Sequence, residues 1–170
     1  DAETSGSVNT LHLNEDNIVI GENTDVYGFQ AAYLKKIDNN TIKKALIIGA
    51  GGVSPSVILS LYKSGINSIS ITNRTHEKCL FLKKNFCYLN VLPWDNLQSK
   101  INNYDIVINA TSLGLKNDKD FDFDFIKFKN DAVYIDTIYN PLKTKTYKYL
   151  EEFLYNQSSF STSSPSPGYV

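Results

Sequence analysis

The sequence predicts an α/β fold built on a doubly wound parallel sheet, and three consecutive features carry this prediction. Residues 44–48 form a short apolar run, which is typical of a buried strand. A glycine-rich turn follows at residues 49–52, and after it comes a run with helical periodicity. A second apolar strand is predicted at residues 68–75. Strand, turn, helix and strand make one βαβ unit, the building block of a Rossmann-type sheet.

Before this unit the sequence predicts a hairpin and a helix. The two expected strands are residues 8–13 and 17–20, and the expected helix is residues 26–36. The polar residues 14–16 supply the turn of the hairpin. Asn23 or Thr24 can cap the first turn of the helix, with Asp25 stabilised by the helix dipole. A cap explains these residue types, but it does not explain the hairpin that leads into them.

After the βαβ unit the chain offers further segments for the same sheet. The expected elements are a helix at 76–85, a strand at 88–92, a helical turn from 93, a strand at 104–114, a strand at 132–136 and a helix at 144–155. Residues 116–129 alternate acids, lysines and phenylalanines, which fits either an edge strand or a loop with a short helix. Residues 158–170 are rich in Ser and Pro, and we expect them to be disordered.

The glycine turn predicts a dinucleotide site. The residues expected to hold the pyrophosphate are Gly49, Ala50, Gly51, Gly52 and Val53. Glycines let the backbone approach the pyrophosphate, and the following helix offers unpaired N–H groups and a positive dipole end. Ser54 stands at the sixth position of the G-x-G-x-x-G pattern, where a small residue still permits close packing. The alternative is a plain strand-to-helix turn, because glycine patterns also match by chance.

A cation at the end of the second strand favours NADP over NAD. Asn73, Arg74 and Thr75 end this strand, and no acid precedes Glu77 to bind the ribose 2′-OH of NAD. Arg74 is the only arginine among the 17 Lys and Arg residues of the chain. Its forked, permanently charged guanidinium suits the 2′-phosphate of NADP. The alternative is a surface arginine beside a helix cap.

The strand at 104–114 ends in small polar residues. In a doubly wound sheet, ligands lie at the carboxyl ends of the strands. This rule places Asn109, Thr111 and Ser112 at the nicotinamide half of the cleft. The alternative is a polar loop in which Thr111 caps a local turn.

Composition excludes several classes of function. The net charge of -1 gives no electrostatic reason to expect nucleic acid or an anionic membrane as a partner. No apolar run approaches the roughly 18 residues of a membrane span, and residues 1–4 lack the features of a signal peptide. The two cysteines and two histidines match no zinc spacing, so we expect no metal and reduced thiols in the cytoplasm.

Six ordered motifs resemble the shikimate dehydrogenase family, and the resemblance covers residues 6 to about 155. The motifs are Val8-Asn9-Thr10; Asn23-Thr24-Asp25 with Gly28-Phe29; Gly49 to Gly52; Asn73-Arg74-Thr75; Asn109 to Ser112 with Gly114; and Asp136 with Tyr139-Asn140-Pro141. The quinate/shikimate dehydrogenases share nearly all of them. The resemblance implies NADP as cofactor and reversible hydride transfer between NADPH and 3-dehydroshikimate, a step of aromatic amino-acid biosynthesis.

The resemblance also assigns roles to individual residues. Asp25 would be one of a catalytic Lys and Asp pair and bind a substrate hydroxyl, while Asn9 and Tyr139 would contact the same substrate. The implied cofactor residues are Gly49 to Val53 for the pyrophosphate, Asn73, Arg74, Thr75 and Lys78 for the 2′-phosphate, and Thr111, Ser112 and Thr137 for the nicotinamide half. Thr137 departs from the family, which usually has an apolar residue there.

The expected domain organisation follows from the same resemblance. Residues 1–24 would be a remnant of the substrate domain, residues 25–157 the NADP-binding domain, and residues 158–170 a tail. The family's Ser-x-Ser motif and catalytic Lys would precede residue 1, so we expect the partner to be a missing N-terminal domain or a second copy in a homodimer. A non-catalytic NADP(H)-binding module remains an alternative, as does a Rossmann methyltransferase or reductase with another substrate.

Overall fold

A computed structural model describes residues 1–37, 41–115, 127–141 and 143–158 of the chain, with side chains in the last helix described to residue 152. Most of the alternating segment at 116–129 and all of the tail beyond Ser158 lie outside the described residues, so those two predictions stay untested. Ser158 itself ends the last helix, which is longer than the sequence predicted.

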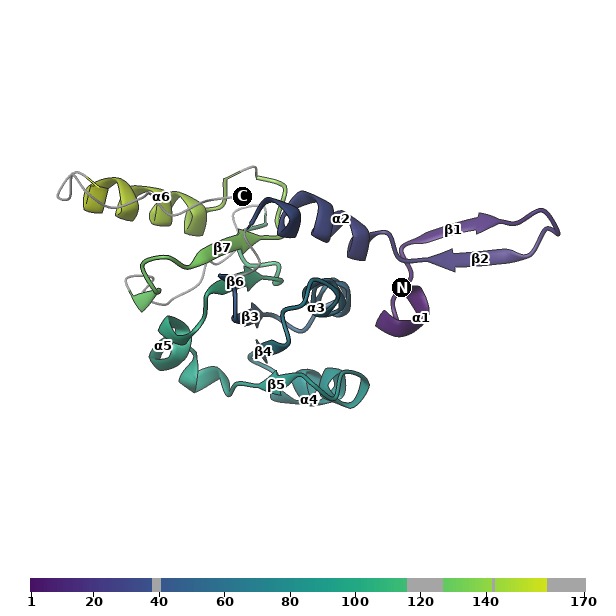
Figure 1. Cartoon of the computed structure of the whole chain (residues 1–170), viewed down its shortest axis with the longest axis horizontal. Coiled ribbons are helices and arrows are strands. Elements are labelled where there is room, and N and C mark those ends of the chain that lie inside the picture. The colour runs from purple at the N-terminus through teal and green to yellow at the C-terminus, as the bar shows by residue number, and fades with distance from the viewer. Residues whose placement is uncertain (38–40, 116–126, 142, 159–170) are drawn as a thin grey trace.

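Five parallel strands form the central sheet in the order β5-β4-β3-β6-β7 (Figure 1). Their bounds are β3 Lys44–Ile48, β4 Ser68–Thr72, β5 Asn90–Val91, β6 Ile106–Asn109 and β7 Val133–Asp136. The chain builds outward from β3 to β5, then returns to add β6 and β7 on the other side of β3. This reversal is the topological switch point of a doubly wound sheet, where ligands bind beyond the carboxyl ends of the strands. The predicted fold class is confirmed.

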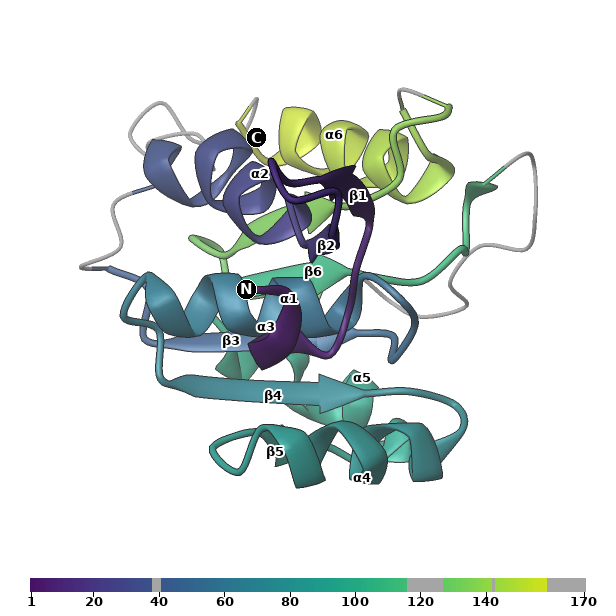
Figure 2. The ribbon, with the colours of Figure 1, turned by 90° about the vertical axis from the view of Figure 1, so that its right-hand side faces the viewer.

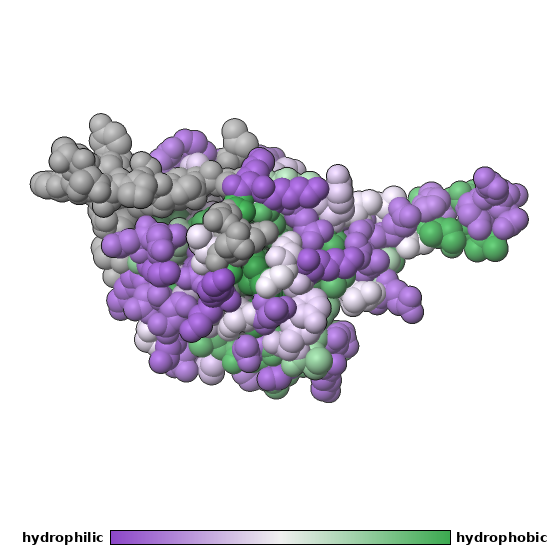
Figure 3. Space-filling view, viewed as in Figure 1, coloured by the Kyte–Doolittle hydropathy of each residue, from purple (hydrophilic) through white to green (hydrophobic). Residues whose placement is uncertain are grey.

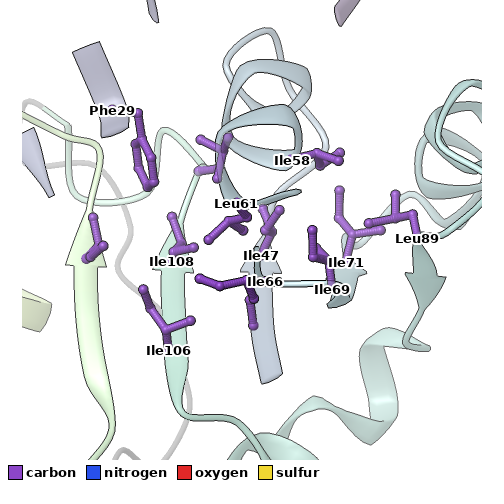
Figure 4. Close-up of a cluster of buried hydrophobic side chains, with 14 of the residues drawn as sticks. Phe29, Ile47, Ile58, Leu61, Ile66, Ile69, Ile71, Leu89, Ile106 and Ile108 are labelled. Atoms are coloured by element: carbon purple, nitrogen blue, oxygen red, sulfur yellow. The ribbon is translucent and has the colours of Figure 1, made fainter. Parts of the chain in front are cut away.

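Helices cover both faces of the sheet, which explains why most residues of β3, β4, β6 and β7 are buried. One face carries α2 Asp25–Ala32, α3 Ser54–Lys63 and α4 His76–Asn85, and the other carries α5 Leu97–Lys100 and α6 Lys145–Ser158. The 3-10 helices are η1 Leu34–Lys36, η2 Trp94–Asn96 and η3 Ile101–Asn103. Figure 4 shows Ile47 and Ile71 of the strands beneath Ile58 and Leu61 of α3.

An antiparallel hairpin and a short helix precede the sheet. The hairpin consists of β1 Thr10–Leu13 and β2 Val19–Glu22, and it projects away from the sheet in Figure 1. In Figure 2, which is viewed from the hairpin side, it lies in front of the rest of the chain. The helix α1, Ala2–Ser5, was not predicted. Leu11, Leu13 and Val19 are 62–70% exposed, and the end of the hairpin shows an apolar patch in Figure 3.

Several predicted bounds were wrong for local reasons. The second hairpin strand begins at Val19 rather than 17, because Asn17 has a left-handed φ of 60° and the Asn14 side chain accepts the N–H of Ile18. The turn therefore uses residues that the sequence placed in the strand. The expected strand at 104–114 shortens to β6, since Tyr104 ends η3 and the chain turns after Asn109. The helix expected at 26–36 divides into α2 and η1.

Candidate functional site

The turn after β3 is closed tightly against the end of β6. Gly49 has a φ of 114°, and its N–H donates to the Thr72 carbonyl at 2.8 Å. A Cβ at this position would lie 2.6 Å from the Ala110 carbonyl oxygen and 2.8 Å from Thr111 Cγ2. Only glycine satisfies both the backbone conformation and the close approach.

The same turn opens toward solvent three residues later, at Gly52. A Cβ at Gly52 would meet nothing within 4 Å in the part of the chain that the structure describes. Within that part, the N–H groups of Gly52 and Val53 also have no hydrogen-bond acceptor. Unpaired N–H groups at the start of a ten-residue helix, α3, form an anion site.

Ser54 has a more specific role than its small size suggested. Its side chain is fully buried, its Oγ accepts the Gly51 N–H at 3.0 Å, and it donates to the Gly49 carbonyl at 3.0 Å. The hydroxyl therefore fastens the turn to the first residue of the helix. Serine at the sixth position of the glycine pattern is thus compatible with the predicted dinucleotide turn.

A pair of cations lies where β4 passes into α4. Arg74 and Lys78 are exposed, and neither forms an ion pair with any described carboxylate. Thr75 is the N-cap residue of α4, and the Asn73 amide donates to the Thr75 carbonyl at 3.0 Å, which shapes the turn. Cations near a helix N-terminus gain nothing from the helix dipole, so their presence favours an anionic ligand over a capping role.

A network of hydrogen bonds shapes the ends of β6 and β7. Asn109 is fully buried; its Nδ2 donates to Asp136 Oδ1 at 3.0 Å, and its Oδ1 accepts the Thr111 hydroxyl at 2.7 Å. The Thr137 hydroxyl donates to the Asn109 carbonyl at 2.8 Å. Thr111 therefore makes local hydrogen bonds in the turn after β6, as the alternative of a local cap predicted. The same residue also lines the cleft described below.

Asp136 is the centre of this network, although no role was predicted for this residue. Its Oδ1 also accepts the Ile138 N–H at 3.0 Å, and its Oδ2 accepts the Thr144 hydroxyl at 2.9 Å. Burial raises the pKa of the Asp136 carboxyl, although these donors act in the opposite direction. The carboxylate fixes the loop from Thr137 to Tyr139 to the start of α6.

The start of α2 is held by Asn23, which is 6% exposed. Its Oδ1 accepts the N–H groups of Asp25 and Val26 at 3.0 and 3.3 Å, while Nδ2 donates to Ser5 Oγ and Ser56 Oγ, each at 2.9 Å. Of the two predicted capping side chains, Asn23 is the one that binds the helix. The carboxylate of Asp25 is exposed and has no partner among the described residues.

One cleft of about 770 Å³ joins these segments at the carboxyl edge of the sheet. It is lined by Asp25, Gly49, Ala50, Gly51, Gly52, Val53, Asn73, Arg74, Thr75, Lys78, Trp94, Ala110, Thr111, Ser112, Leu113, Leu115, Thr137, Ile138 and Tyr139. The structure thus brings together every residue predicted to bind the cofactor, and also Asp25 and Tyr139. Asn9 is outside the lining, but its Oδ1 accepts the Thr24 N–H at 3.0 Å, one residue from Asp25.

Five lining residues were not predicted: Trp94, Ala110, Leu113, Leu115 and Ile138. Each follows the end of a strand, and in a doubly wound sheet this position is itself a signal for a ligand site. They were not predicted because they are apolar, whereas the residues expected to bind a cofactor were glycines, polar residues and cations.

The described residues hold no group of three or more His, Cys, Asp or Glu side chains that could bind a metal ion. Cys79 is buried and Cys87 is exposed, and both thiols are free. Burial raises the pKa of Cys79 to about 11, so this thiol stays protonated at neutral pH. Of the helices that the structure describes, none is long and apolar enough to cross a membrane.

Comparison with known sequences gives one family. The family described as Shikimate / quinate 5-dehydrogenase matches residues 32–117. A shikimate dehydrogenase (NADP(+)) of Pelagibacter ubique is 40% identical over 153 residues, which are 90% of this chain and 56% of the relative. The corresponding protein of Maridesulfovibrio salexigens is 39% identical over 84% of this chain and 51% of its own length. The chain therefore spans about half the length of these curated relatives.

Solved structures give the same result. Shikimate dehydrogenase from Aquifex aeolicus superposes with a TM-score of 0.76 at 34% identity, over 89% of this chain and 54% of that one. Shikimate 5-dehydrogenase from Thermus thermophilus, solved with NADP(H) and shikimate, superposes with a TM-score of 0.71 at 28% identity, over 89% and 55%. The fold is thus shared with proteins of this family over most of the chain.

Proposed function

The chain belongs to the shikimate/quinate 5-dehydrogenase family, and from this premise we propose that it is the NADP-binding portion of an NADP-dependent shikimate dehydrogenase. The reaction would be hydride transfer between NADPH and the ring ketone of 3-dehydroshikimate. The observation that carries the proposal is the single cleft in which all the predicted cofactor residues meet. We also propose a cytoplasmic location, in keeping with two free thiols.

The residues of the cleft fit NADP. The free N–H groups of Gly52 and Val53 would bind the pyrophosphate, in the space that a side chain at Gly52 would fill. Arg74 and Lys78, which lack carboxylate partners among the described residues, would bind the 2′-phosphate. Thr111, Ser112 and Thr137 would then border the nicotinamide half.

The substrate would meet the cofactor at the end of β7. When bound, NADPH supplies the hydride, and the chain's own residues orient the acceptor. Asp25 has a free carboxylate in the cleft and would accept a hydrogen bond from a substrate hydroxyl. Asn9, held beside it through Thr24, would contact the same substrate with its amide, and Tyr139 would border the pocket. Such positioning raises the rate by fixing the ketone against the hydride donor.

The cofactor assignment can be tested by titrating the chain with NADPH and NADH and following reduced-nicotinamide fluorescence. We expect Arg74→Ala to weaken NADPH binding by about 1.5–3 kcal/mol and to leave NADH nearly unchanged, because only NADPH carries the 2′-phosphate. Lys83→Ala is the matched control, since it removes one positive charge from the far end of α4, outside the cleft. An unchanged NADPH affinity in Arg74→Ala would refute the phosphate assignment.

A module that binds NADP(H) without catalysis is the second candidate. It would need only the glycine turn, Arg74 and Lys78 of the cleft, and it would not need Asp25. Supplying the remaining N-terminal part of that relative as a separate protein distinguishes the two. Shikimate oxidation that appears on mixing, and disappears in Asp25→Asn, supports the enzyme with a companion domain. NADPH binding without any turnover supports the module.

A further inference from the structure

Trp94 is a large aromatic residue in the cleft to which the cofactor prediction assigned nothing. It begins η2, three residues after β5, and it is half-buried. One side packs against the core cluster formed by Leu97, Ile101 and their neighbours, together with Leu92 and Leu113. Another part lines the cleft. A side chain with one face on the core and another on the cleft is held in place before any ligand arrives.

The chemical type of the residues that line the cleft differs from one strand end to the next. The groups suited to phosphates follow β3 and β4, at Gly52 and at Arg74 with Lys78. The groups beside Asp25 and Tyr139 follow β7, at the opposite edge from β5. The larger apolar side chains of the lining are therefore distributed, with Ile138 after β7, Leu113 and Leu115 after β6, and Trp94 beyond the end of β5.

Leu113 shares both of these environments with Trp94, since it also packs against this core cluster and lines the cleft. It follows β6 and packs against the same core cluster, on the face of the sheet away from α3. Its backbone is fixed, because its N–H donates to Thr111 Oγ1 at 3.0 Å. Two apolar side chains that pack on the same core cluster thus border the cleft, Trp94 beyond the end of β5, the strand next to β4, and Leu113 beyond the end of β6.

We propose that Trp94, together with Leu113, forms the binding wall for the adenine base of the cofactor. This inference rests on the proposed function. The 2′-phosphate and the pyrophosphate flank the adenosine ribose, and Arg74 and Gly52 account for both. The base then needs a flat apolar surface next to Arg74 and away from Asp25, and Trp94 supplies it. An indole face stacks on adenine irrespective of hydrogen-bond pattern.

Trp94 is the only tryptophan of the chain, so its emission reports on this wall directly. The probe is adenosine 2′,5′-bisphosphate, which contains the base and the 2′-phosphate but no nicotinamide that could accept energy from tryptophan. We expect saturable quenching of Trp94 emission and protection of Trp94 from acrylamide. Saturable binding of the probe by calorimetry, with emission and acrylamide quenching unchanged, would overturn the inference.

Variants give a second measurement. We expect Trp94→Ala to weaken the bisphosphate and NADPH about tenfold, and Trp94→Phe to stay within about twofold, because one stacked base is lost only in the first. Affinity for nicotinamide mononucleotide should be the same in both. Phe81→Ala is the matched control, because Phe81 is an exposed aromatic residue on α4 outside the cleft.

The outcomes separate this inference from the proposed function. A wild-type chain that binds no NADPH refutes the function itself. NADPH binding that is equally strong in Trp94→Ala refutes only the adenine wall. If Trp94→Ala does not fold, as thermal unfolding will show, the wild-type emission experiment and Trp94→Leu, which keeps the apolar bulk without an aromatic face, decide the matter.

Discussion

The two edges of the parallel sheet use aspartate in opposite ways. Asp105 lies at the amino edge, directly before β6, and Asp136 ends β7 at the carboxyl edge. Asp105 Oδ2 accepts the N–H groups of Lys43 and Lys44 at 2.8 and 2.9 Å, and Oδ1 pairs with the Lys129 ammonium at 2.8 Å. Partial burial acts to raise its pKa, but these charged and backbone donors outweigh burial and lower it.

At the carboxyl edge the balance is reversed. Asp136 accepts hydrogen bonds only from neutral groups in the described part of the chain, and burial raises its pKa. The cations of this edge, Arg74 and Lys78, stand apart from it without described carboxylate partners. At the amino edge Asp105 is paired with a cation and two backbone N–H groups, whereas the carboxyl edge leaves N–H groups and two cations that line the cleft available for a ligand. The difference separates a structural edge from a binding edge.

The largest expected loss of stability is at Gly49, where the turn after β3 packs against the end of β6. Gly49→Ala should destabilise the chain by about 3 kcal/mol or more, because the new Cβ adds backbone strain at positive φ and a clash with Ala110. Calorimetric unfolding measures this loss. Gly52→Ala is the control, since its Cβ enters open space; stability should change by about 0.5 kcal/mol or less while NADPH affinity falls. Equal destabilisation by both variants would contradict the boundary between closed and open turn.

The amino edge gives the next largest effect. Asp105→Asn should cost about 1.5–3 kcal/mol at pH 7, because a charge-assisted pair and an anionic acceptor are lost. The lowered pKa means that this contribution is present above pH 3.8 and is lost as pH falls through the folded-state pKa. Urea unfolding of wild type and variant should therefore converge in acid.

Asp131→Asn is the control for that experiment. Asp131 also contacts Lys129, at 3.3 Å, but its side chain is 74% exposed. Exposed pairs contribute little, so this variant should change stability by about 0.5 kcal/mol or less at any pH. A cost as large as that of Asp105→Asn would show that Lys129, rather than the backbone donors, carries the effect.

The smallest expected effect on stability is that of Asp136, and its pH dependence should be opposite to that of Asp105. The pKa of Asp136 is raised above 3.8, so its ionisation costs stability as pH rises through the folded-state pKa. Relative to Asp136→Asn, which does not titrate, wild type should lose about 1 kcal/mol or less of unfolding free energy between acid and neutral pH. Urea unfolding across that range measures the slope. If the unfolding free energy of wild type instead rises relative to that of Asp136→Asn toward neutral pH, the two aspartates do not behave in opposite ways.

Much of this arrangement can be read from the sequence, because its signals are local. The apolar run of β3 and the glycine turn identify a parallel sheet and its switch point, and Arg74 stands out as a single arginine. Features that depend on distant contacts stayed hidden. Asp136 acquires its role from Asn109 and Thr144, which lie 27 and 8 residues away. The sequence could not show that pairing.

The misplaced hairpin strand and the unassigned Trp94 have different causes. Asn14 shortens β2 through a side-chain hydrogen bond that competes with the strand ladder, and residue type alone does not show which contact wins. Trp94 reads as an ordinary core aromatic, since its position beside the cleft depends on how the chain returns beneath the sheet. The first case depended on a local competition between hydrogen bonds, and the second on the tertiary structure.

Asn23 has a mechanical consequence. One amide joins the N-terminal segment at Ser5, the helix α3 at Ser56 and the first turn of α2 at Asp25. The hairpin therefore cannot swing relative to α3 without either breaking these bonds or rotating Asp25. Asn23 thus couples the position of the hairpin to the position of the Asp25 carboxylate in the cleft.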